Sequence, residues 1–292
     1  MERSPCSEKA SHSQGLILSR LHTPGCSVYA VFLSDAYWDQ FDKPECSMEI
    51  KMSKIDTKGL VLRIFIPTIV LSVSYFILGH FCSIPHILLF CILGTFILMP
   101  IELGMILKAS KREYGKYSLQ SAFVGQEKCS IWKVLMIAFV LFGMAGLLSA
   151  FIAPVENQVF AGIRSDLLQH LPSGFDWTNY EYLKTFSKPM LVLTCVYYGI
   201  FNVFIGPVTE ELFFRGYLTS HYEKQGPITP ILIAVFFSLY HFWLPFNNLF
   251  RISAFAPAAY AAYKKRNLYI SLCFHCLCNL FSTLSFILAV FA

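Results

Sequence analysis

The stretch IWKVLMIAFVLFGMAGLLSAFIAP, residues 131–154, decides the class of fold, because Lys133 is its only charged residue. A helix needs roughly 20 mostly apolar residues to cross the hydrocarbon core of a bilayer. Backbone polar groups in that core must be bonded within the protein, which leaves helices and closed barrels. The apolar residues here are continuous instead of alternating, so the stretch predicts a membrane-spanning helix.

The rest of the chain repeats this pattern. Of its 292 residues, 55% are hydrophobic and 14% are charged, whereas a soluble domain carries about a quarter charged residues. We therefore predict an all-α fold, a polytopic transmembrane helical bundle with about 7–8 membrane helices. The expected helices, besides residues 131–154, are Leu60–Phe81, Ile84–Leu107, Pro189–Ile205, Ile228–Leu244, Leu249–Tyr263 and Leu268–Phe291.

The polar segments indicate domains and orientation. Residues 1–57 contain no apolar run of spanning length, so we expect a cytoplasmic N-terminal extension ahead of a membrane-embedded domain at 58–292. Basic residues cluster in KASKREYGK (108–116) and KKR (264–266), and cytoplasmic loops are enriched in such residues. The mixed-charge segment 156–188 is expected as a loop on the opposite side. We predict a multi-pass integral protein of the plasma or inner membrane in a bacterium, or of the endoplasmic reticulum in a eukaryote.

Ionisable and amide side chains within the apolar runs are the candidates for function. Such groups are costly in a membrane, usually face the interior of the bundle and mark functional sites. In the last third of the chain they are Glu210, Glu211, Arg215, His241, Arg251, His275 and Asn279.

The stretch PVTEELFFRG, residues 207–216, holds three of these candidates. Glu211 and Arg215 are four residues apart and share a helix face, so they are expected to be neighbours. They could simply form an ion pair near a helix start that favours acidic groups. Glu210 is rotated by about 100° on the helix and has no local partner. The pair Gly206-Pro207 predicts a break or a kink. A single straight helix over 189–222 would be about 50 Å long, so it would have to bend, tilt strongly or project beyond the membrane.

The two histidines and the amide lie on other apolar segments. His241 is expected late in the helix 228–244, and His275 and Asn279 share one face of the last helix. Each of them alone could serve as an interhelical hydrogen bond. Together with Glu210 they can converge in one bundle. There the glutamate could act as a general base on water while the other groups stabilise an oxyanion, which is hydrolysis of an amide bond.

A metal site is the alternative chemistry. Glu210, His241 and His275 form a ligand set known for catalytic zinc, with a position open for water. The sequence contains no HExxH motif, which excludes the usual helical zinc-protease arrangement. We expect no cofactor, and these three residues are the ligands if a divalent metal such as zinc is bound.

Three short motifs carry a resemblance to a known family. They are EELFFR at 210–215, read as EExxxR, FSLYH at 237–241, read as FxxxH, and HCLCN at 275–279, read as HxxxN. In this order on membrane helices they resemble the CPBP intramembrane proteases. That family comprises type II CaaX prenyl endopeptidases and the bacterial Abi, bacteriocin-immunity and lysostaphin-resistance-like relatives. The resemblance covers about 189–290.

The resemblance implies a membrane endopeptidase that cuts a peptide bond with a glutamate-activated water. By position, Glu210 resembles the base, His241 its partner in holding the water, and His275 and Asn279 the oxyanion-stabilising pair. In the CaaX-processing members, three C-terminal residues are removed from a prenylated protein.

The remaining motif positions, Glu211 and Arg215, are implied to support the site. The expected partners are the lipid bilayer and a membrane-associated protein or peptide substrate, lipidated in the CaaX-processing members, and no nucleic acid. Two other functions stay open. Intramembrane glutamate and histidine also relay protons in transporters, and a member of the same fold can serve as a non-catalytic immunity factor or scaffold.

Overall fold

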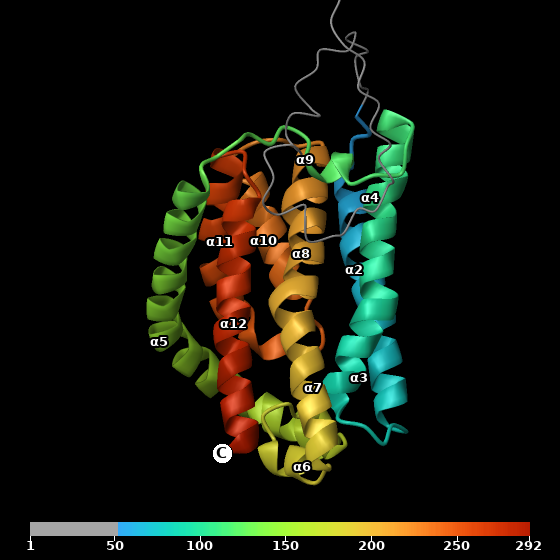
Figure 1. The fold of residues 1–292 in the computed structure, drawn as a ribbon, viewed down its shortest axis with the longest axis vertical. Helices are drawn as coiled ribbons and strands as arrows, with labels where there is room; N and C mark the ends of the chain where they lie inside the picture. The colour runs from blue at the N-terminus through green and yellow to red at the C-terminus, as the bar shows by residue number, and fades with distance from the viewer. Residues whose placement is uncertain (1–51) are drawn as a thin grey trace, which may run out of the picture. The chain divides into compact units, whose positions relative to one another are not determined.

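The computed structural model describes residues 52–292, which form a bundle of roughly aligned helices (Figure 1). The expected extension at 1–57 thus lies almost wholly outside the described residues. The α-helices are α2 (Thr57–Gly79), α3 (His86–Leu93), α4 (Met99–Tyr114), α5 (Ile131–Gln169), α6 (Tyr180–Lys184), α7 (Lys188–Ile200), α8 (Gly206–Glu211), α9 (Thr219–His221), α10 (Thr229–Leu239), α11 (Asn248–Lys264) and α12 (Tyr269–Phe291). Three π-helical segments, Gly94–Leu98, Phe201–Ile205 and Leu212–Leu218, join some of them, and short 3-10 turns lie at Gln120–Ala122, Ser173–Phe175 and Pro245–Asn247. The described residues contain no strand, so the predicted all-α class is confirmed.

Five helical passes are long and apolar enough to cross a membrane. They are Thr57–Gly79, His86–Tyr114, Ile131–Gln169, Lys188–His221 and Tyr269–Phe291. The other two expected segments are also helices, but α10 has 11 residues and α11 has 17. These two pack against each other as a pair (Figure 1). The protein is thus an integral membrane protein with a helical bundle.

Helix α5 lies at the outer edge of the bundle, where it contacts α11 and α12 (Figure 1). Only 17% of its most apolar window is buried. Val140, Leu147 and Phe151 are 69%, 67% and 74% exposed. Large apolar side chains on an outer face are unfavourable in water and favourable in lipid, so this face is suited to the bilayer.

The end of α5 corrects a prediction. Residues 156–169 belong to this 39-residue helix and not to a loop. Pro154 lies inside the helix and does not end it. Proline lacks the backbone N–H of a helical hydrogen bond, but membrane helices tolerate this loss where neighbouring groups bond to the carbonyl that is left free. The extension has a structural use. Glu156 is buried, and its carboxylate accepts the N–H groups of Leu249 and Phe250 at 2.8 and 2.9 Å, which caps the start of α11.

The pass from Lys188 to His221 is helical throughout its 34 residues, so of the break or kink expected at Gly206-Pro207, the break is absent. The π-helical turn Phe201–Ile205 immediately precedes this pair. Such a turn shifts the hydrogen-bond register by one residue, which accommodates a proline without a break. The pass is about 51 Å long at 1.5 Å per residue. It runs from the α6 end of the bundle to the opposite end (Figure 1).

The second half of this pass lies inside the bundle. Phe213, Phe214 and Leu218 are fully buried. A Cβ atom on Gly216 would lie 2.5 Å from the carbonyl oxygen of Ala122, so only glycine permits this approach of the loop after α4. The stretch that carries Glu210 and Glu211 is therefore embedded among other elements, as a shared site requires.

The basic segments of the sequence meet at one end of the bundle. The Glu127 N–H donates to the Arg266 carbonyl at 2.6 Å, and the Asn267 side chain donates to the Glu127 carbonyl at 2.8 Å. Ser53, just ahead of α2, bonds to Glu113 at the end of α4. This agrees with the expected common side for the segments 108–116 and 264–266.

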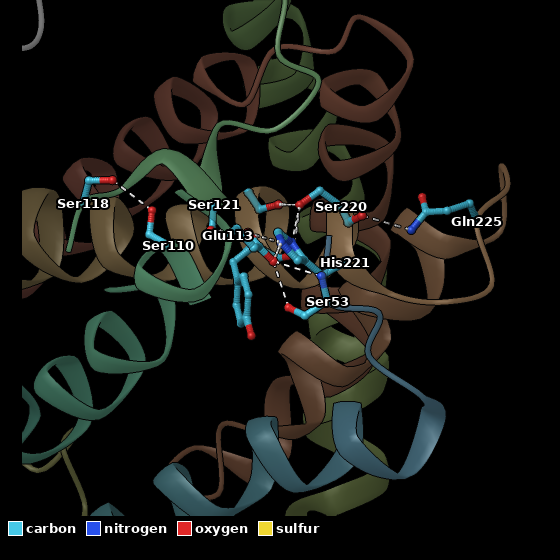
Figure 2. Close-up of polar contacts among 10 residues, drawn as sticks. Ser53, Ser110, Glu113, Ser118, Ser121, Ser220, His221 and Gln225 are labelled. Carbon is cyan, nitrogen blue, oxygen red and sulfur yellow. Dashed lines mark hydrogen bonds and ion pairs between the residues drawn. The ribbon is translucent and has the colours of Figure 1, made fainter. Parts of the chain in front are cut away.

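A buried polar cluster closes this end, and Figure 2 shows Glu113 between Ser53, Ser121 and His221. Oε1 of Glu113 accepts the N–H and hydroxyl of Ser53 at 3.1 and 2.8 Å, and Oε2 accepts the Ser121 hydroxyl at 2.5 Å. Nε2 of His221 lies 3.0 and 3.1 Å from the two oxygens. The cluster ties the segment before α2 to the ends of α4 and α9.

Candidate active site

The two glutamates of α8 lie at the centre of the bundle with different surroundings. The Glu211 side chain is 0% exposed, whereas the Glu210 side chain is 14% exposed. Their neighbours come from helix α12, from the turn after α10 and from the π-helical segment Leu212–Leu218. The two glutamates of α8 therefore contact side chains that lie 30 and 64 residues further along the sequence, Tyr240 and His275.

Glu211 makes the inner contacts. Its Oε1 lies 3.3 Å from Nη1 of Arg215, an ion-pair contact that does not have hydrogen-bond geometry, so the expected neighbour pair is present. The same oxygen lies 3.0 Å from Nδ1 of His275, which the sequence did not indicate. The Arg215 guanidinium also lies over the ring of Phe237, 4.2 Å from its centroid, which is a cation–π contact. Glu211 thereby holds both the arginine and the imidazole.

Glu210 has the more open arrangement. The Tyr240 hydroxyl donates to its Oε1 at 2.7 Å. Its Oε2 lies 3.6 Å from Nε2 of His275, which is too long for a direct hydrogen bond. His275 consequently lies between two carboxylates, one on each ring nitrogen. In the part of the chain that the structure describes, Oε2 of Glu210 has no hydrogen-bond donor, so it can accept one from a water or a substrate.

His241 lies in a different local structure from the one expected. Helix α10 ends at Leu239, so His241 belongs to the turn that follows and not to the helix. Its Nδ1 donates to the Phe237 carbonyl at 2.7 Å, which fixes the ring. The ring packs between Tyr240 and Trp243, with centroids 4.7 and 5.0 Å away. Because Nδ1 is engaged, Nε2 of His241 is the ring nitrogen that can contact a water or a substrate.

Asn279 lies one turn beyond His275 on α12, as expected. Its side-chain N–H donates to the carbonyl of Asn202 at 2.8 Å. The Asn202 amide in turn donates to the Thr283 hydroxyl at 2.9 Å. Asn202 belongs to the π-helical turn Phe201–Ile205, whose carbonyl groups are partly released from the helical ladder. The side-chain nitrogen of Asn279 also lies 3.5 Å from Oδ1 of Asn202, which is a long contact, so one of its two N–H groups is firmly committed to orienting the amide.

These groups line one cavity of about 270 Å³. Its polar wall consists of Glu102, Asn202, Thr209, Glu210, His241, Arg251, His275, Asn279 and Ser282, and aromatic side chains form much of the rest. Because a water occupies about 30 Å³, the space holds roughly nine waters or a short peptide segment. All four residues predicted to be catalytic share this cavity, while Glu211 and Arg215 lie behind the wall.

Sequence reasoning missed three residues of this site. Glu102 on α4 is buried, and neither of its carboxylate oxygens has a described partner. It was visible as an acidic residue inside the apolar run 84–107. Asn202 was visible in the same way, as an amide inside the apolar run 189–205, whereas Tyr240 gave no such signal, since tyrosine is common at the ends of apolar segments. Arg251 was visible as an intramembrane cation but had no assigned role.

The metal alternative depends on at least three donors converging. Among residues 52–292, no group of three or more histidine, cysteine, aspartate or glutamate side chains is positioned to hold a metal ion. Nδ1 of His241 and Nδ1 of His275 are engaged with Phe237 and Glu211, which leaves Nε2 of each ring as the nitrogen that would face a metal ion. A metal ion held by Glu210, His241 and His275 would therefore require these donors to move closer together.

Comparison with known proteins agrees with the three motifs. No curated protein and no solved structure matches the chain. The family model described as type II CAAX prenyl endopeptidase Rce1-like matches residues 192–281, a span that contains all six predicted site residues. Glu102 lies outside this span. Residues 192–281 are therefore a domain of the Rce1-like type II CAAX prenyl endopeptidase family, a family of membrane proteases.

Proposed function

We propose that this protein is an intramembrane endopeptidase in which Glu210 activates a water molecule for attack on a peptide bond. The observation that carries the proposal is the carboxylate of Glu210 on the wall of the cavity, because one of its two oxygens has no described hydrogen-bond donor. One oxygen is fixed by the Tyr240 hydroxyl at 2.7 Å, and the other is free to accept a proton from water. A general base must lie within hydrogen-bond reach of the proton that it takes.

The proposed reaction uses the groups around this carboxylate. A water held between Glu210 and Nε2 of His241 loses a proton to Glu210 as its oxygen attacks the carbonyl carbon. The carbonyl oxygen becomes an oxyanion, which His275 and the second N–H of Asn279 stabilise. When the C–N bond breaks, Glu210 returns its proton to the departing amine. The products are a new carboxyl group and a new amino group.

Glu211 and Arg215 are proposed to position His275. The carboxylate of Glu211 faces Nδ1 at 3.0 Å, which favours a hydrogen on that nitrogen. A histidine that donates to an oxyanion must then carry a second hydrogen on Nε2, and the neighbouring carboxylate stabilises that charged ring. Arg215 balances the charge of Glu211 from the other side.

The proposed substrate is a membrane-associated protein or peptide that is prenylated near its C-terminus. This class follows from the family described as CAAX prenyl endopeptidases. The lining of the cavity is compatible with it, since Phe90, Leu98, Trp177 and Phe201 provide apolar walls. A lipid-attached substrate would reach such a site from the bilayer, which also concentrates it.

The test is cleavage of an internally quenched, S-farnesylated peptide by the purified protein in lipid nanodiscs. We expect Glu210→Gln to abolish cleavage, because an amide cannot take the proton. Glu181→Gln is the matched control, since this glutamate is 85% exposed on α6 and should leave the rate unchanged. Normal cleavage by Glu210→Gln would refute the general-base assignment.

We further propose that the reaction needs no bound metal ion. Incubation with 1,10-phenanthroline followed by desalting should leave the rate unchanged. Loss of activity and its recovery with zinc would replace the proposed mechanism by the metal alternative through Glu210, His241 and His275.

A further inference from the structure

Arg251 is the only lysine or arginine among the residues that line the cavity. Its Nη1 donates to the Ser238 carbonyl at 3.1 Å and to Asn248 Oδ1 at 3.3 Å, and its Nη2 donates to the Leu244 carbonyl at 3.4 Å. These three acceptors are neutral. By contrast, Arg215 lies against the carboxylate of Glu211. Within residues 52–292, no carboxylate lies within ion-pair distance of Arg251.

The fold accounts for the neutral hydrogen bonds of this cation, one of which caps a carbonyl group at the end of α10, but it does not account for the lack of an ionic partner. Arg251 lies in the first turn of α11, where the helix dipole disfavours positive charge. Glu210 and Glu156 are the acidic groups whose charge acts on Arg251, but neither lies within ion-pair distance, and both oxygens of Glu156 accept the backbone N–H groups of Leu249 and Phe250. A cation that is withdrawn from water without an ionic partner is costly in a membrane protein and marks a functional position.

The guanidinium is held in a fixed orientation with spare donors. It has five N–H groups, and the three contacts, from the end of α10, the turn after it and the start of α11, leave some of them unused. A planar fork of this kind matches a carboxylate, which it binds with two parallel hydrogen bonds. The turn after α10, which supplies the Leu244 carbonyl to Arg251, also contains His241, so the cation and the proposed water-binding histidine are neighbours of one segment.

The rest of the wall restricts where an anion can bind. Glu102 and Glu210 are the two carboxylates that line the cavity, and both repel a negatively charged group. A carboxylate in the cavity is therefore favourable beside Arg251, or beside His275, which the proposed reaction commits to the oxyanion. The cavity holds roughly nine water volumes, which is enough for a short peptide end but not for a long chain.

We propose that Arg251 binds the C-terminal carboxylate of the substrate and thereby restricts cleavage to bonds close to a chain end. This inference rests on the proposed endopeptidase function and adds to it the group that the enzyme recognises. The C-terminal peptide released by hydrolysis still carries the recognised carboxylate. Arg251 is therefore expected to bind this product as well as the substrate.

The test compares two S-farnesylated peptides that differ only at the C-terminus, one a free acid and the other a primary amide. In the wild-type protein we expect amidation to lower kcat/KM roughly 10- to 100-fold, the value of a charge-assisted hydrogen-bonded pair. Arg251→Gln should cleave the acid and the amide equally, at about the wild-type rate for the amide. Arg251→Lys should keep part of the preference, because it keeps the charge and loses the fork.

The matched control is Arg164→Gln. This arginine is on α5, outside the cavity lining, and its partner is Asp176, so the preference for the acid should be unchanged. Equal cleavage of acid and amide by the wild-type protein would overturn the inference. An equal loss for both peptides in Arg251→Gln would also overturn it, since Arg251 would then act on the catalytic groups and not on the carboxylate.

A binding measurement separates this inference from the proposed function. The tripeptide Val-Ile-Met, as acid and as amide, is titrated into the Glu210→Gln protein while tryptophan fluorescence is followed, because Trp177 and Trp243 line the cavity. We expect the acid to bind roughly 10- to 100-fold more tightly. Equal binding refutes the role of Arg251 even if cleavage stands. Selective binding without any cleavage refutes the protease and retains the carboxylate site.

Discussion

Glutamate and histidine side chains are buried together at two places in this bundle, one around Glu113 and one around Glu210, and these two glutamates differ in how fully they are bonded. In the pair at the end of the bundle, both oxygens of Glu113 accept hydrogen bonds from Ser53, Ser121 and His221. In the pair at the cavity, Glu210 accepts one described hydrogen bond, from Tyr240, and lies 3.6 Å from His275. The residue types are the same, but only the second pair has unused bonding capacity beside a cavity.

The first pair also contains a false sign of catalysis. Ser220 Oγ lies 2.8 Å from Nδ1 of His221, whose Nε2 faces Glu113, which is the order of a serine–histidine–acid triad. However, the Tyr217 carbonyl also lies 2.8 Å from Nδ1 and can only accept a hydrogen bond. Nδ1 therefore carries a hydrogen and cannot take a proton from the serine. Burial and pairing do not identify a site, whereas unsatisfied groups at a cavity do.

The largest expected effect separates activity from stability at the cavity pair. Glu210→Gln should lower kcat by about 10²- to 10⁴-fold, the usual contribution of a general base. Its midpoint of thermal unfolding in nanodiscs should be unchanged or higher, because the amide still accepts from Tyr240 and no longer buries a charge. A large drop in the midpoint would mean that Glu210, like Glu113, is mainly structural.

The reverse result is expected at the other pair. Glu113→Gln leaves the His221 imidazole buried without its carboxylate, so we expect a loss of about 3 kcal/mol in the free energy of unfolding. The rate of peptide cleavage per folded molecule should not change. Glu127→Gln is the control, since its contact with Arg266 is exposed and should contribute nothing measurable to stability. Lost activity in folded Glu113→Gln would contradict the structural assignment.

The sequence predicted the features that depend on composition and local spacing. Apolar runs of spanning length identified the membrane bundle, and the i, i+4 spacing predicted the contact between Glu211 and Arg215. The cavity residues stood out because ionisable groups are rare in such runs. Glu113 and His221 lie at the ends of apolar runs, where charge is ordinary, so nothing in the sequence indicated a pair that spans 108 positions.

The features that sequence missed depend on neighbouring segments. A proline predicts a break, but the π-helical turn at Phe201–Ile205 absorbs Pro207, and Pro154 lies within α5. The end of α10 at Leu239 places His241 in a turn, a boundary that an apolar run through residue 244 does not reveal. The bond from Tyr240 to Glu210 exists only because that turn folds against α8.

A smaller effect is expected when the one described hydrogen bond to Glu210 is removed. Tyr240→Phe should lower kcat/KM roughly 5- to 10-fold, because the carboxylate loses the group that orients it. The midpoint of thermal unfolding should hardly change, since the ring still fills its place. Tyr197→Phe is the matched control, because its hydroxyl bonds to Thr95 and the residue does not line the cavity. An equal loss of activity in both variants would contradict a specific role for Tyr240.

The smallest expected effect is the matching change at the structural pair. Ser121→Ala removes one of several donors to Glu113 and should cost about 1 kcal/mol of stability, with no change in the cleavage rate. Ser285→Ala on α12 is the control, because its hydroxyl is exposed and bonds only to the Phe281 carbonyl of its own helix. Tyr240 and Ser121 each donate to a buried carboxylate. If Tyr240→Phe lowers only the cleavage rate and Ser121→Ala lowers only the stability, then the effect of such a hydrogen bond depends on whether the carboxylate is otherwise fully bonded, and not on whether it is buried.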